Sequence, residues 1–231
     1  AGLFGGLLGG LVHGAGEAFL NLSAGSTLLA KATASDDARA AGATNFANEA
    51  GGMATAMVGG LIAVGADGDD EVEAGGVWNS SRFGDARMGV LGTSDIKVDV
   101  VGALAGSATG LRNVTGEGKA RLVVDAGASI GVSAIGEFYS DAIGAENIAA
   151  GDGNARSSLA GVVSASASSA SGDAEAIGLN TETEGVGNAA ADVKSMASIT
   201  ATSTAANGFA GAIGVGSEAY GAGDASSSSE A

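Results

Sequence analysis

The chain has 231 residues, including 50 alanines, 42 glycines and 25 serines, but neither proline nor cysteine. Its 26 acidic and 10 basic side chains give a formal net charge of −16 at pH 7. The absence of cysteine excludes a disulfide framework, and a Ser-His-Asp enzyme would depend on the single histidine, His13. We therefore expect no enzyme activity. No basic patch is evident in the sequence, so we also expect no binding to the phosphates of nucleic acid.

Residues 1–15 differ from the rest of the chain, because large apolar side chains recur there at helical spacing, with glycines on the opposite side. The many glycines weaken a helix, so an extra strand is the alternative. In either form we interpret the segment as a cap on the first repeat or as a contact between subunits. We do not expect membrane binding, since the segment is too short to span a bilayer and has no basic face. The residues expected to form the cap or contact are Leu3, Phe4, Leu7, Leu8 and Leu11.

Two interleaved motifs repeat through residues 16–231. A series of seven Gly-x-Ala triplets runs from Gly16 to Gly223 at spacings of 32 to 36 residues. A second series, of six Ala-x-Gly triplets, runs from Ala40 to Ala212 at spacings of 34 to 36 residues. Between these motifs apolar residues alternate with a period of two, which is typical of a β-strand and not of a helix.

Strands that recur about every 34 residues predict a β-solenoid, in which each coil buries its apolar face against the next. We expect an all-β protein of about six coils of 34–36 residues, formed as one domain by residues 16–231 after the apolar segment 1–15. Small residues would let the walls approach closely, and glycines would adopt the positive φ angles of the corners. Another all-β sheet or barrel, a helical repeat and a disordered chain are the alternatives.

The densest acidic cluster lies on a glycine-containing turn in the second repeat. Carboxylates in such a turn are the ligand type that Ca²⁺ prefers, so calcium is the one cofactor that the sequence suggests. The spacing matches neither of the common calcium-loop motifs, however, and a solvated corner of the solenoid is the simpler interpretation. The four candidate ligands are Asp67, Asp69, Asp70 and Glu71.

Hydroxyl side chains replace apolar ones in the alternating segments of the last two repeats. If these hydroxyls face outward, they form a flat array that could order water and bind ice. If they face inward, they form hydrogen-bonded ladders; a shift of one residue would instead place Val163 and Ile199 in the core. The ladder residues are Ser164, Ser166, Ser168, Thr200, Thr202 and Thr204.

The segment Ala212-Ile-Gly-Val-Gly-Ser-Glu-Ala-Tyr-Gly221 resembles the head repeats of trimeric autotransporter adhesins, which are β-solenoids with coils less than half as long. The composition also resembles that of silk-like structural proteins, although long Gly-Ala or poly-Ala blocks are missing. Both resemblances imply a non-catalytic role outside the cell, and neither transfers a functional residue.

These observations favour a secreted structural protein that assembles with itself, head to tail or laterally, into a filament, sheath or matrix. We expect it outside the cell or on the cell surface. A segment of a cell-surface adhesin is the first alternative, and an ice-binding solenoid is the second.

Overall fold

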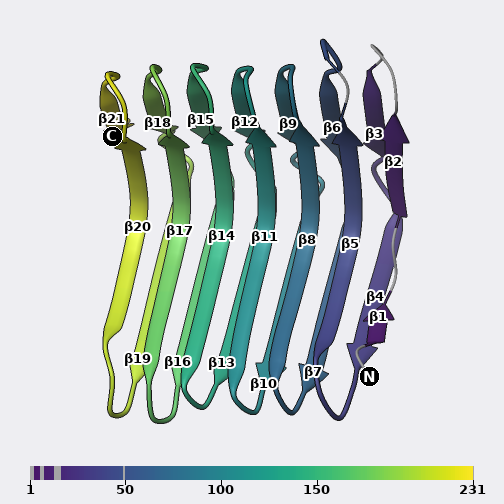
Figure 1. The fold of residues 1–231 in the computed structure, drawn as a ribbon, viewed down its shortest axis with the longest axis vertical. Helices are drawn as coiled ribbons and strands as arrows, with labels where there is room; N and C mark the ends of the chain where they lie inside the picture. The colour runs from purple at the N-terminus through teal and green to yellow at the C-terminus, as the bar shows by residue number, and fades with distance from the viewer. Residues whose placement is uncertain (1–2, 6–7, 13–16, 49, 231) are drawn as a thin grey trace.

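The computed structural model describes residues 3–5, 8–12, 17–48 and 50–230, and every regular element in these ranges is a β-strand. The strands form three parallel sheets that wind into a solenoid, and each turn of the chain adds one strand to each sheet (Figure 1). The predicted all-β solenoid of about six coils is confirmed. Within the described ranges there is no helix with the length and apolar character of a membrane span.

We name the sheets A, B and C, and the chain passes from sheet B to sheet C to sheet A in each coil. Sheet A contains β1 (Leu3–Gly5), β2 (Leu8–Val12), β5 (Ala38–Ala47), β8 (Glu71–Ser81), β11 (Ala105–Thr115), β14 (Tyr139–Ala149), β17 (Asp173–Thr183) and β20 (Ala210–Ala219). Sheet B contains β3 (Ala18–Leu22), β6 (Ala54–Val58), β9 (Ala86–Val90), β12 (Ala120–Val124), β15 (Ala155–Leu159), β18 (Ala189–Val193) and β21 (Ala225–Ser229). Sheet C contains β4 (Thr27–Thr33), β7 (Leu61–Gly68), β10 (Asp95–Gly102), β13 (Ser129–Gly136), β16 (Val162–Ser169) and β19 (Ser198–Ala205).

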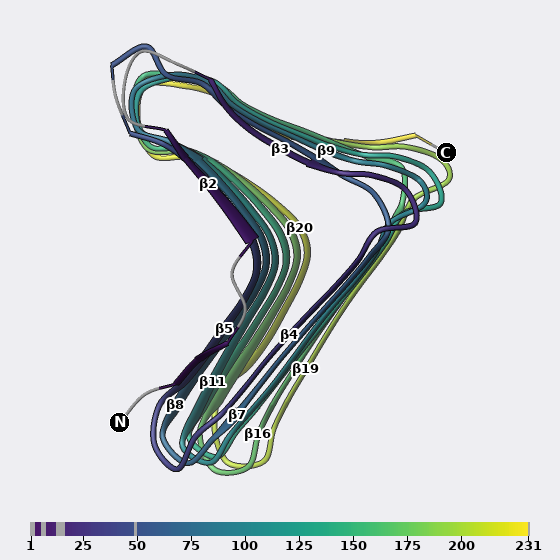
Figure 2. The ribbon, with the colours of Figure 1, turned by 90° about the vertical axis from the view of Figure 1, so that its right-hand side faces the viewer.

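The long strands of sheet A are bent, and sheets B and C each face one half of the bent sheet (Figure 2). The inward side chains of all three sheets form one continuous apolar core. Ile96 and Val98 of sheet C and Leu111 of sheet A are fully buried in it. The alternation of apolar and polar residues along each strand therefore separates an inner from an outer face.

Among the described residues, each of the two sequence motifs forms a column of stacked glycines. The glycine of Ala-x-Gly lies in the middle of the long strands of sheet A, where a Cβ on Gly110 would lie 2.5 Å from the carbonyl oxygen of Gly144 in the next coil. The glycine of Gly-x-Ala lies in the turn that leads into sheet B, where a Cβ on Gly153 would overlap the carbonyl oxygen of Gly118. Close packing between coils, and not only special backbone angles, therefore explains why glycine recurs.

Positive φ angles are rarer than the sequence suggested. Among the described glycines only Gly25, Gly51, Gly60 and Gly127 have them. The expectation that corner glycines generally need such angles is wrong, because most corner glycines instead provide room for the neighbouring coil.

A ladder of buried asparagines joins the coils between sheets A and B. The side chain of Asn45 donates to that of Asn79, Asn79 donates to Asn113, and Asn113 donates to Asn147, at 2.7–2.8 Å. Asn113 also donates to the backbone carbonyls of Ala86 and Arg121 on sheet B. The ladder satisfies polar groups that would otherwise be costly to bury, and it ties the two sheets together.

The apolar segment at the start of the chain adds strands and not a helix. Both β1 and β2 pair in parallel with β5, so they extend sheet A beyond the first coil, as the extra-strand alternative predicted. Leu3 and Phe4 lie in β1 and Leu8 and Leu11 lie in β2, whereas Leu7 and His13 lie outside the described residues.

The last coil has its inner face only partly covered. Strands β19, β20 and β21 are the outermost strands of their sheets, and no described strand pairs with their other edges. Ile199, Ala201 and Val215 pack on the core from this coil but remain partly exposed.

Candidate functional site

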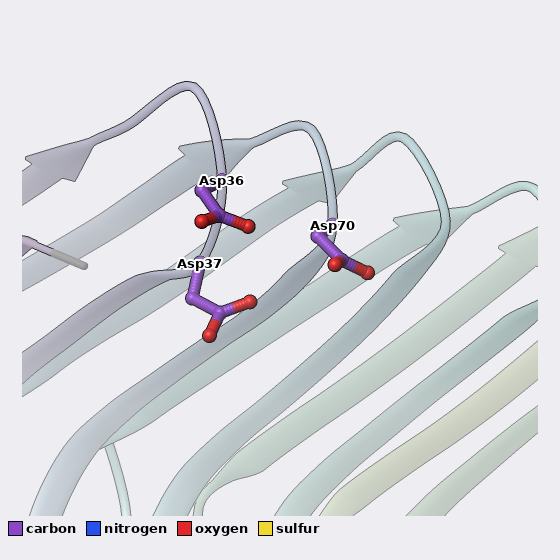
Figure 3. Close-up of side chains that lie close together, drawn as sticks. All are labelled: Asp36, Asp37 and Asp70. Atoms are coloured by element: carbon purple, nitrogen blue, oxygen red, sulfur yellow. The ribbon is translucent and has the colours of Figure 1, made fainter. Parts of the chain in front are cut away.

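Three aspartates meet at the turn between sheets C and A (Figure 3). Asp36 and Asp37 lie between β4 and β5, and Asp70 lies at the equivalent turn of the next coil. One carboxylate oxygen of each aspartate lies within 4.8 Å of those of the other two. Carboxylates are suitable ligands for Ca²⁺, but the ion takes six to eight oxygens, so these three side chains alone do not complete its coordination sphere.

The calcium ligands suggested by the sequence do not come together as a set. Of Asp67, Asp69, Asp70 and Glu71, only Asp70 belongs to the aspartate cluster found among the described residues, and the other three are exposed. The remaining members come from the preceding coil, 33 and 34 residues earlier. Stacking of coils, and not proximity in the sequence, creates this cluster.

The hydroxyl residues of the last two repeats lie on the outer face of sheet C. Ser166 pairs with Thr202 of the next strand, whereas Val163 stacks on Ile130 and Ile199 stacks on Val163. Val163 is fully buried. A constant period of 34 residues would pair Ser164 with Ile130. The structure instead pairs Val163 with Ile130, so the one-residue shift is correct and Ser164 faces outward.

The hydroxyl face extends over three strands. Ser133 of β13 stands in register with Ser166, so one column of hydroxyls runs from Ser133 through Ser166 to Thr202. Earlier coils place Lys31, Gly65 and Asp99 in the same column. The outer face of sheet C is thus charged near the start of the solenoid and rich in hydroxyls near its end. The remaining outward hydroxyls on β16 and β19 are Ser164, Ser168, Thr200 and Thr204.

Acidic side chains gather on the outer face of sheet A over the later coils. Burial raises the pKa of Asp141 to about 6, and the negative charges of Glu175 and Glu146 raise it further. Glu175 is the direct neighbour of Asp141 on the next strand. Burial also raises the pKa of Glu146, although the nearby guanidinium of Arg112 opposes this effect.

The raised pKa of Asp141 predicts a loss of stability as the pH increases. The folded chain binds this proton more tightly than the unfolded chain, so stability falls between about pH 4 and pH 6 and stays lower above that range. Replacing Asp141 with asparagine should raise the free energy of unfolding at pH 8 by about 1–3 kcal/mol and change it little near pH 3. Urea unfolding of both proteins across this pH range measures the difference.

A matched control is Asp99→Asn on the exposed outer face of sheet C, for which we expect a change below about 0.5 kcal/mol at either pH. Equal stability of the Asp141→Asn variant and the unaltered protein at pH 8 would contradict the prediction.

A basic groove crosses the outer face of sheet B. It encloses about 710 Å³ and is lined by basic side chains from successive coils. These residues are Arg87, Lys119, Arg121, Arg156 and Lys194. The expectation that the chain has no basic patch is therefore wrong for this face. In three successive repeats an arginine follows the Gly-x-Ala triplet, and the register of sheet B brings these arginines together on one surface.

Comparison of the chain with protein-family models, with curated proteins and with solved structures finds no match in any of the three. The local resemblances to adhesin heads and to silk-like proteins gain no support from these comparisons. The solenoid architecture is established by the structure itself.

Proposed function

We propose that the protein is a non-catalytic structural protein that acts outside the cell and assembles through stacked β-coils into a filament, sheath or matrix. The observation that carries this proposal is the unbroken parallel register of the three sheets from coil to coil. Such stacking forms a rod in which every coil adds backbone hydrogen bonds and buried side chains. The location outside the cell rests on the sequence resemblances alone.

Addition of a further coil is the simplest way to extend this rod. The outer edges of β19, β20 and β21 offer backbone groups for pairing, and exposed strand edges readily pair with other chains. Ile199, Ala201 and Val215 offer an apolar surface that a further coil would bury. In a second copy, β3 and β4 provide strands of nearly the same length as β21 and β19, and β1 and β2 together provide the edge of sheet A.

The test introduces a charge where the next coil would pack. Ala201→Lys places an ammonium group on the inner face of the last coil, whereas Thr202→Lys places the same charge on the outer face of the same strand. Because burying an unpaired charge costs several kcal/mol, we expect Ala201→Lys to raise the concentration needed for assembly at least tenfold. We expect Thr202→Lys to leave it nearly unchanged.

Sedimentation velocity and negative-stain microscopy of the purified 231-residue chain measure assembly, with and without a calcium chelator. Filaments or sheets that disappear only in Ala201→Lys support the proposal. An unaltered chain that stays monomeric up to high concentration overturns it.

The hydroxyl face of sheet C favours one alternative, which is an ice-binding solenoid. The column from Ser133 to Thr202 forms part of the outward hydroxyl array that such a function requires. Thermal hysteresis of the unaltered chain that is lost in Thr202→Tyr would support this alternative. An adhesin segment, the other alternative, would instead bind a cell surface as a monomer.

A further inference from the structure

Three arginines form a straight column on the outer face of sheet B. Arg87 of β9 pairs in register with Arg121 of β12, and Arg121 pairs with Arg156 of β15. Neighbouring strands lie about 4.8 Å apart, so each guanidinium group is attached one strand spacing from the next along the solenoid axis. All three residues are exposed.

Two arginines of sheet A, in contrast, lie opposite acidic residues. On sheet A, Arg39 lies opposite Glu73 of the next coil at 3.6 Å, and Arg112 lies opposite Glu146 at 3.2 Å. Like charges directly opposite each other on neighbouring strands are destabilising. The arginine column therefore carries a repulsion that a bound anion would relieve.

The surroundings of the column strengthen its positive character. Five of the ten lysines and arginines of this acidic chain line the groove, against two acidic residues, Asp85 and Asp192. Asp85 pairs with Arg87 at 3.0 Å, and Lys194 pairs with both Asp192 and Glu230. In the part of the chain that the structure describes, Arg121 and Arg156 form no ion pair. Their guanidinium groups are thus available to a ligand.

We infer that this groove binds a linear acidic polysaccharide that carries carboxylate or sulfate groups. The column is straight and runs along the axis, so a complementary ligand must present anionic groups in a line. Each sugar ring of an extended polysaccharide advances the chain by a length close to the strand spacing of about 4.8 Å. Guanidinium groups suit these anions because their planar donors bind two oxygens at once.

The lining of the groove argues against nucleic acid as the ligand. Proteins that hold single-stranded nucleic acid stack its bases on aromatic side chains, and no phenylalanine, tyrosine or tryptophan lines this groove. The inference concerns a different surface from the strand edges of the proposed assembly, so it holds for a monomer as well as for a filament.

Binding of the intact chain to immobilised polygalacturonate and dextran sulfate, measured by biolayer interferometry, tests the inference, with neutral dextran and single-stranded DNA as comparison probes. We expect binding to both acidic polysaccharides, none to neutral dextran, and weaker binding at high salt because the contacts are exposed. The double variant Arg121→Ser/Arg156→Ser should bind at least tenfold more weakly. The matched variant Lys31→Ser/Arg82→Ser removes the same charge elsewhere and should bind within twofold of the unaltered chain.

Each possible result of these binding measurements either supports or overturns the inference. Loss of binding in the groove variant alone, with an unchanged or raised melting temperature, supports the inference. Competition by inorganic sulfate on the unaltered chain adds support that does not depend on any variant. No binding to either acidic polysaccharide, equal loss in both double variants, or tighter binding to the DNA probe would overturn it.

Discussion

Replacing Asn113 with alanine is expected to lower the free energy of unfolding by about 2–4 kcal/mol, because several buried hydrogen bonds disappear together. The Asn113 side chain donates to Asn147 and to the backbone carbonyls of Ala86 and Arg121, and it accepts a hydrogen bond from Asn79. It is fully buried, so water cannot replace these partners without opening the core. The loss should spread to neighbouring coils, since the ladder links them in series.

Urea unfolding followed by circular dichroism measures this effect. Asn21→Ala, at an exposed position on β3, is the matched control and should change the stability by less than about 0.5 kcal/mol. If the two variants were equally stable, the asparagine ladder would contribute nothing specific to the stacking of the coils.

Replacing Gly110 with alanine should have a comparable effect for a different reason. A Cβ at this position would lie 2.5 Å from the carbonyl oxygen of Gly144 and 2.7 Å from the Cγ2 atom of Ile130. Backbone atoms of the next coil cannot move away without breaking the register of sheet A. We therefore expect a loss of about 2–4 kcal/mol in the free energy of unfolding.

Gly131 provides the matched comparison for this variant. It lies on the outer face of sheet C, and a Cβ there would meet no atom within 4 Å. Gly131→Ala should therefore be neutral or stabilise the protein by up to about 1 kcal/mol, because alanine has less freedom to lose on folding. Thermal unfolding of both variants checks the contrast, and similar melting temperatures for the two would show that the middle of β11 tolerates a side chain.

Much of the architecture was predictable because the repeat is encoded locally. The Gly-x-Ala and Ala-x-Gly motifs indicated the coil length, and the structure stacks each of them into one column. The alternation in Ile62, Val64 and Ala66 correctly indicated a strand with its apolar residues facing inward. The helical spacing of residues 1–15 was misleading, since the segment forms β1 and β2, and short apolar runs rich in glycine do not distinguish the two structures.

The candidate sites were much harder to predict. The aspartate cluster, the asparagine ladder and the arginine column each combine residues from different coils. The ladder does have a signal in the sequence, because its asparagines recur every 34 residues at Asn45, Asn79, Asn113 and Asn147. The step from Ile130 to Val163, in contrast, is 33 residues long, and it made the inward side chains of β16 hard to predict. One missing residue reverses which side chains of a strand face the core.

By itself, the sequence determined that this protein consists of strands, that they recur about every 34 residues, and that small residues occupy the tightest positions. Local alternation and steric size are sufficient for these conclusions. Only the tertiary structure decided which residues of successive coils become neighbours, because the register depends on the length of every intervening turn. That register converts an acidic, alanine- and glycine-rich chain into a solenoid with a basic groove, an acidic face and a hydroxyl face on its outer surface.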